Sequence, residues 1–171
     1  MAEQGNVNAQ FNLGLAYANV EDYKQAVKWY RKAAVREYKQ LPDEEYLLDY
    51  NGMPDEPKIK TPDVGARAEY AIGSLYEKGL GVLESYTKAG KHYRESARWN
   101  YPQGQLAYAK LTLRVLRDDL IEGITKEDRI NGYKEAAKFV SKLYENERAT
   151  DEMHKEAEEL WSEYELHKYP Y

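Results

Sequence analysis

Residues 68–97 read AEYAIGSLYEKGLGVLESYTKAGKHYRESA, and the same chain carries an earlier copy of this stretch. In both copies, small and aromatic residues recur at the three- and four-residue spacing of a helical face. Each copy has two such halves, so each predicts a pair of helices. Repeated helix pairs are typical of solenoid proteins, in which each unit buries its apolar face against its neighbours. The matched positions are Ala9, Leu13, Gly14, Tyr17, Ala26, Tyr30 and Ala34 in the first copy, and Ala68, Ile72, Gly73, Tyr76, Ala89, Tyr93 and Ala97 in the second.

Apolar periodicity also predicts the order of the helices. A third, degenerate copy of the repeat begins at Gln103, and Tyr144 is expected on the buried face of its second helix. Asp22 is a predicted N-cap, and Gly79 is suited to end a helix in the left-handed conformation. The last helix has one apolar and one acidic face, which is typical of a cap that covers the core and faces water. The expected helices span residues 7–18, 23–40, 63–78, 84–100, 103–118, 127–146 and 150–166.

Residues 41–63 interrupt the repeat. Pro42, Pro54, Pro57, Pro62 and Gly52 cannot all lie inside regular helix. A period of about 34 residues would place the second copy about 25 residues earlier than it occurs, so this segment is an insertion between repeats. Loops of this length are either functional or disordered, and the sequence leaves both alternatives open.

The composition predicts a single domain without disulfides. The chain has 171 residues and no cysteine, which excludes a disulfide framework, a cysteine-ligated metal site and a thiol nucleophile. No apolar run approaches the roughly 18 residues of a membrane span. No signal peptide is recognisable, so the chain as given is expected to be cytoplasmic, and periplasmic or secreted if an upstream segment was removed. Its first residues read as the last turn of a repeat whose front half is missing.

Two acidic segments dominate the net charge of −5. Residues 42–63 hold seven acids against two lysines, and residues 145–165 hold nine acids against Arg148 and Lys155. A uniformly basic surface of the kind that binds nucleic acid is not predicted. The acidic segments are interpreted either as solvated faces or as a patch that steers a basic partner.

The motif AQFNLGLAY followed by YKQAVKWYRKAA, within residues 9–34, resembles the Sel1-like repeat, a relative of the tetratricopeptide repeat. The second copy matches more fully, with the turn GLGV at residues 79–82. The first copy departs in its turn, which is four residues shorter (26 − 14 = 12 against 89 − 73 = 16), and His92 replaces the usual tryptophan.

This resemblance implies an all-α fold, a right-handed α-α superhelix of antiparallel helix pairs with an inserted loop and a C-terminal capping helix. One domain over residues 1–171 would comprise repeat one at 5–40, the loop at 41–63, repeat two at 64–100, a degenerate repeat three at 102–146 and the cap at 150–166. In such families the first helices line a concave groove, and the second helices form the outer wall.

The resemblance also implies which residues bind a partner, because the groove-facing positions lie on the first helices, off the packing stripe. Three acids and a tyrosine of the acidic insertion are further candidates. The implied groove residues are Asn8, Phe11, Asn12, Leu15, Arg67, Tyr70, Ser74, Glu77, Gln103, Leu106, Lys110 and Leu113, and those of the insertion are Asp43, Glu44, Glu45 and Tyr46.

The residues that could carry chemistry favour structural roles. His92 occupies a packing position, and His154 with Glu158 is expected to form an exposed pair four residues apart on one helix. A zinc site needs three or four convergent ligands, which these histidines do not provide. No nucleophile or metalloprotease motif is present, and nothing isolates a carboxylate to raise its pKa. We therefore predict no catalytic site, no metal and no cofactor.

The predicted function is protein–protein interaction. An adaptor or scaffold would bind a partner protein or peptide, with basic partners among the candidates, through the groove, the acidic insertion or both. The alternative is a dedicated inhibitor or immunity protein that neutralises a toxin or hydrolase, because the chain is small and its acidic insertion could fill a basic active site. An enzyme is a remote alternative. Neither nucleic acid binding nor membrane insertion is expected.

Overall fold

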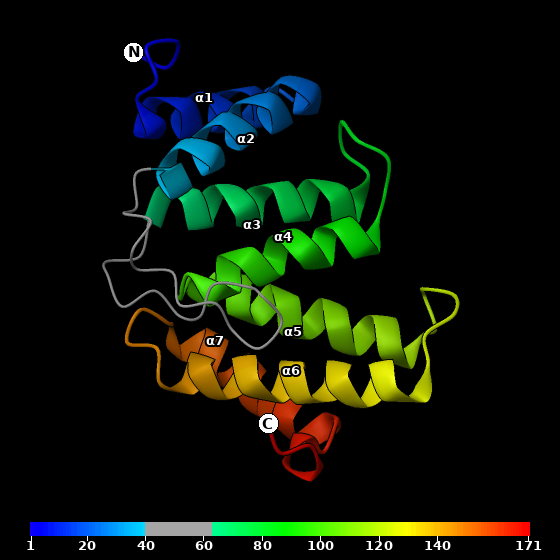
Figure 1. The fold of residues 1–171 in the computed structure, drawn as a ribbon. Helices are drawn as coiled ribbons and strands as arrows, with labels where there is room; N and C mark the ends of the chain where they lie inside the picture. The colour runs from blue at the N-terminus through cyan, green and yellow to red at the C-terminus, as the bar shows by residue number, and fades with distance from the viewer. Residues whose placement is uncertain (40–62) are drawn as a thin grey trace.

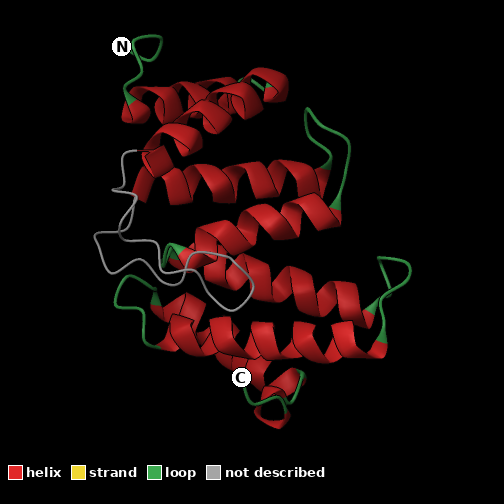
Figure 2. Cartoon of the chain, viewed as in Figure 1, coloured by secondary structure: helices red, strands yellow, loops and turns green. Residues whose placement is uncertain are grey.

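The computed structural model describes residues 1–39 and 63–171 of the chain, without side-chain placement for residues 35–39. Within these ranges every regular element is helical (Figure 2). Consecutive helices run antiparallel and stack in layers from one end of the molecule to the other (Figure 1). The elements are α1 (Val7–Asn19), α2 (Tyr23–Lys39), α3 (Asp63–Lys78), α4 (Tyr86–Arg98), α5 (Pro102–Arg117), α6 (Lys126–Tyr144), α7 (Asp151–Glu163) and the 3-10 helix η2 (Leu166–Lys168).

The two helices of each of the first two pairs meet at a glycine. A Cβ added to Gly14 would lie 2.6 Å from Cδ1 of Tyr30, and one added to Gly73 would lie 2.6 Å from Cδ1 of Tyr93. Each tyrosine ring therefore lies directly on the glycine of the preceding helix and leaves no space for a side chain at that position. The repeated glycine and tyrosine in the sequence correspond to one repeated contact in space.

The third pair packs differently, which explains why its sequence looks degenerate. Ala109 takes the position of the glycine and is fully buried. Tyr108 instead packs edge-on against Phe139 of α6, with ring centroids 5.2 Å apart and planes at 77°. A small, buried residue is kept at this position, while the aromatic contact involves the neighbouring Tyr108.

The turns match their sequence signals. The side chain of Asp22 accepts a hydrogen bond from the backbone N–H of Gln25 at 3.2 Å, as expected of an N-cap. Gly79 ends α3 with a φ of +66°, in the left-handed region. Gly81, also at positive φ, lies so close to the start of α2 that a Cβ there would be 2.5 Å from the carbonyl carbon of Tyr23. The longer turn of the second repeat thus packs against the first repeat.

The C-terminal helix continues the stack. α7 contacts both α5 and α6, as α3 contacts α1 and α2, so it occupies the place of a first helix in a fourth pair. The prediction of one helix over residues 150–166 is wrong in its last turn. α7 ends at Glu163, Glu165 adopts a left-handed φ of 49°, and η2 then places the fully buried Leu166 against the core.

The all-α solenoid of antiparallel helix pairs is confirmed, and one packing prediction fails. Tyr144, expected to be buried, is 44% exposed and stacks on His154 with ring centroids 6.3 Å apart. It lies in the last turn of α6, where α7 covers the helix only in part. None of the helices in the described ranges is long and apolar enough to cross a membrane.

We expect Gly73→Ala to destabilise the fold by about 1–3 kcal/mol, because the new Cβ would displace the buried Tyr93 ring. Gly90→Ala is the matched control, since a Cβ there meets only Cδ2 of Leu111 at 3.9 Å. In the interior of α4 the control substitution should stabilise by about 0.5–1 kcal/mol. Urea unfolding measures both changes, and equal effects of the two substitutions would contradict the close contact at Gly73.

Candidate binding groove

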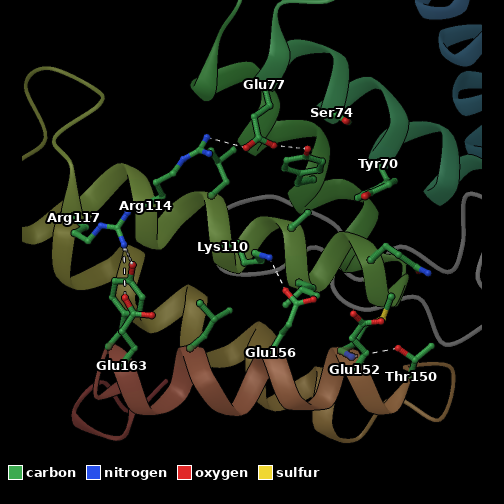
Figure 3. A pocket seen from close by; sticks show the side chains of 18 of the residues that line it. Tyr70, Ser74, Glu77, Lys110, Arg114, Arg117, Thr150, Glu152, Glu156 and Glu163 are labelled. Carbon is green, nitrogen blue, oxygen red and sulfur yellow. Dashed lines mark hydrogen bonds and ion pairs between the residues drawn. The ribbon is translucent and has the colours of Figure 1, made fainter. Parts of the chain in front are cut away.

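The first helices α3, α5 and α7 together form an open groove of about 610 Å³ (Figure 3). The groove is lined by polar, charged and aromatic side chains, and its aliphatic side chains come from α5 and α7. α5 forms its floor, and α3 and α7 face each other across it. The main contributors are Tyr70, Ser74 and Glu77 from α3, Gln103, Leu106, Lys110, Arg114 and Arg117 from α5, and Glu152, Met153, Glu156, Glu163 and Tyr164 from α7 and its C-cap.

An aromatic cluster lies at one end of the groove. The Tyr70 ring is 5.7 Å from the Tyr93 ring and 5.8 Å from the Tyr101 ring, the second pair in an edge-to-face arrangement. Burial raises the pKa of the Tyr70 phenol, and the nearby Glu77 raises it further. Tyr70 is therefore a half-buried, uncharged ring that presents a fixed surface to the groove.

Glu77 organises the upper wall. Its carboxylate accepts a hydrogen bond from the Tyr93 hydroxyl at 2.6 Å and another from Nη2 of Arg114 at 2.8 Å. The guanidinium of Arg114 also lies over the Tyr86 ring, 5.3 Å from its centroid. The pKa of Tyr93 is raised, first by burial and then by its hydrogen bond to Glu77. These contacts tie α3 to α4 and α5 at the edge of the groove.

Ion pairs join α5 to α7 across the other wall. Nζ of Lys110 lies 2.6 Å from Oε2 of Glu156, and Nη1 of Arg117 donates to the Tyr164 hydroxyl at 3.0 Å (Figure 3). Arg117 also lies 3.7 Å from Oε1 of Glu163. These side chains are 35–58% exposed, and exposed pairs of this kind contribute about 0–1 kcal/mol each. These ion pairs therefore contribute little to holding α7 in place.

The charges of the residues that line the groove sum to zero, but the two signs lie mostly on different helices. The acids are on the outer helices, and most of the cations are on the central one. The lining acids are Glu77, Glu152, Glu156 and Glu163, and the lining cations are Lys78, Lys110, Arg114 and Arg117. No group of three or more His, Cys, Asp or Glu side chains among the described residues could hold a metal ion.

The structure brings six of the predicted groove residues together. They line one wall and the floor of the groove, although Leu106 is only 8% exposed. The six are Tyr70, Ser74, Glu77, Gln103, Leu106 and Lys110.

Predicted residues on α1 lie outside the groove. Asn8, Asn12 and Leu15 are exposed but do not line it. Arg67 stacks its guanidinium on the Phe11 ring, 4.6 Å from the centroid. Arg67 and Phe11 therefore belong to the contact between α3 and α1.

Two of the predicted residues are in the core, and those positions are corrected. Phe11 is only 5% exposed and packs against Tyr30 with ring centroids 5.4 Å apart. Leu113 is fully buried between α5 and α6. On both helices the buried face is wider than the repeat motif indicates, because each first helix also contacts the next layer. Asp43, Glu44, Glu45 and Tyr46 lie outside the described residues.

The acidic wall of α7 is not among the predicted groove residues. The sequence places Glu152, Glu156 and Glu163 in an acidic segment interpreted as a solvated face or as a patch that steers a basic partner, and in the structure they point into the groove (Figure 3). The spacings of four and seven residues do indicate that these acids share one helical face. The sequence does not indicate that this face lines the groove, because that follows from α7 taking the place of a first helix.

The histidines have structural contacts. Nδ1 of His92 lies 2.6 Å from Oε2 of Glu69, and its ring stacks on Tyr76 with centroids 5.4 Å apart. This agrees with the predicted packing role. Nε2 of His154 lies 3.1 Å from the Leu143 carbonyl oxygen, so this ring is directed to α6 rather than to Glu158 as expected.

Comparisons with known proteins place the chain among repeat proteins. The profile of the Sel1 repeat family matches residues 7–34 and 66–98. No curated protein matches the chain. Among solved structures, a Sel1 repeat protein from Oxalobacter formigenes is similar over 99% of this chain, with a TM-score of 0.50 and 25% identity, and this chain spans 61% of its length. A second, c5321, a protective antigen of uropathogenic Escherichia coli that displays an SLR fold, is 26% identical over 94% of this chain and 38% of its own, with a TM-score of 0.32.

The raised pKa of Tyr93 predicts a loss of stability at alkaline pH. Below the unfolded pKa of about 10 the phenol is protonated in both states, and its contribution is complete. Above pH 10 the unfolded state ionises first, so the free energy of unfolding falls by up to about 1.4 kcal/mol per pH unit for this group. Tyr93→Phe should show a shallower decline in urea unfolding between pH 9 and 11. Identical slopes for the two proteins would contradict the assignment.

Proposed function

Because this chain is a Sel1-like repeat protein, we propose that it binds another protein by holding a polypeptide segment of that protein in the groove between α3, α5 and α7. Sel1 repeats are generally protein–protein interaction modules, and proteins built from them are generally non-catalytic scaffolds. The proposal goes further in naming the surface and the kind of ligand.

The observation that carries the proposal is the composition of the groove. A half-buried aromatic ring, Tyr70, lies beside polar groups that come from three different helices. Interfaces obtain most of their binding energy from a few such aromatic or arginine anchors, surrounded by polar contacts at the rim. An extended segment that crosses the helices would contact the anchor and charged groups of both signs.

The exposed ion pairs of the groove suit this role. Lys110 with Glu156 and Arg117 with Glu163 contribute little to folding, so opening them for a ligand costs little. Once open, each charge can pair with a group on the partner. Pairing of this kind governs specificity and association rate more than total affinity.

The inhibitor alternative depends on a different part of the chain. Its motivation is the acidic insertion, whose residues 42–62 lie outside the described ranges. Groove and insertion can be separated experimentally, because the lining residues of α3, α5 and α7 can be substituted without changing residues 42–62.

We expect Tyr70→Ala to weaken binding of a partner captured from the native host by about 30-fold, the scale of an aromatic anchor. Replacing residues 42–62 with a Gly/Ser linker should leave the affinity within a few-fold of the unaltered chain. Lys28→Ala, on the exposed face of α2, is the control for a surface change away from the groove. Isothermal titration with the purified partner gives the affinities.

A partner that binds the Tyr70→Ala variant normally, and loses binding when the insertion is replaced, would contradict the groove and support the inhibitor alternative. Circular dichroism and urea unfolding of each variant establish that a loss of binding does not come from a loss of fold.

A further inference from the structure

The aromatic end of the groove differs chemically from the rest. Its lining combines the Tyr70 ring with Gln103, Glu152 and Met153, and Figure 3 shows Tyr70 and Glu152 on opposite sides of this end. None of these four side chains carries a positive charge. The cation closest to the middle of the groove, Lys110, is already joined to Glu156.

Glu152 differs from the other acids of the groove in its lack of an ion pair with the described residues. Glu77, Glu156 and Glu163 each form an ion pair with a cation of α5, whereas Glu152 forms none with any described residue. Its side chain is exposed in the first turn of α7. With respect to the described part of the chain, this carboxylate is open to a cation of a ligand.

A second acceptor at the same end also lacks a donor. Oε1 of Gln103 is buried and has no hydrogen-bond partner among the described residues. A buried polar atom without a partner is costly. Within the described ranges, both observations indicate a missing hydrogen-bond donor on this side of the groove.

We propose that the aromatic end of the groove accepts a lysine or arginine side chain of the bound polypeptide, a proposal that rests on the function proposed above. The cationic group would pair with Glu152 and lie against the Tyr70 ring, where cation–π attraction adds to the ion pair. A partner carboxylate would instead meet Glu152 with the same charge and find no cation among the four lining side chains at this end. An aliphatic side chain would leave both acceptors unpaired.

The charge of α7 favours the same ligand. Residues 151–163 contain six acids and one lysine, which gives a net charge of −5 (1 − 6 = −5). A field of this sign attracts a basic segment and raises its association rate, and salt screens the effect. α7 would therefore steer the segment, and Glu152 would fix the position of its basic side chain.

The test uses the full-length chain, fluorescently labelled, on arrays of nine-residue peptides that are random except for a fixed central residue. The central residue is Arg, Lys, Gln, Leu or Glu. We expect the chain to be retained by the Arg and Lys sets about ten-fold more strongly than by the Glu set, the scale of one ion pair supported by an aromatic ring. Glu152→Lys should reverse this preference.

Glu158→Lys is the matched control, because it makes the same charge change on the same helix at an exposed position that does not line the groove. It should keep the preference for basic peptides. An equal loss of preference in both variants would show an effect of net charge alone and would overturn the proposal.

The remaining outcomes separate this inference from the proposed function. Peptide binding that Tyr70→Ala abolishes, but that shows no preference among central residues, would retain the groove and overturn the basic side chain. Failure of the unaltered chain to bind any peptide set would overturn both.

Discussion

The contact between a glycine of a first helix and a tyrosine ring of the second helix fixes the geometry of the first two helix pairs, on which the later layers stack. At Gly14 and Gly73 the ring occupies the space of a side chain, so the two helices of a pair approach closely and in a fixed register. That register directs the opposite face of each first helix away from its partner. Because successive pairs stack on one another, these faces align, and the concave groove results from the packing of the layers.

The C-terminal helix turns this general surface into a specific groove. α7 takes the place of a fourth first helix, so its acidic face lies opposite α3 with the cations of α5 between them. Lys110 and Arg117 then find acids on α7, while Arg114 finds Glu77 on α3. Folding satisfies most of these charges internally and leaves Glu152 without an ion-pair partner among residues 1–39 and 63–171. Which acids of the groove can pair with a ligand therefore depends on which of them the helix geometry places within reach of the α5 cations.

Much of the fold could be predicted from the sequence, because the repeat encodes the contact itself. The repeated glycine and tyrosine, the cap at Asp22 and the left-handed Gly79 are local signals with one physical interpretation. The lining of the candidate groove was predicted only in part, since the predicted positions came from the repeat motif of each helix taken separately. Phe11 is buried because α3 covers it, and the acids of α7 face the groove because of how α7 docks. Both are properties of the assembled layers, which periodicity within a single helix does not contain.

The most direct test of the account is hydrogen–deuterium exchange of the full chain with and without a purified, captured partner. A polypeptide segment held in the groove should slow amide exchange in α3, α5 and α7, because binding stabilises these helices against local opening. Exchange in α2 and α4, on the outer wall, should change much less. Protection confined to α2 and α4, or to the insertion, with unchanged exchange in α3, α5 and α7, would contradict the account.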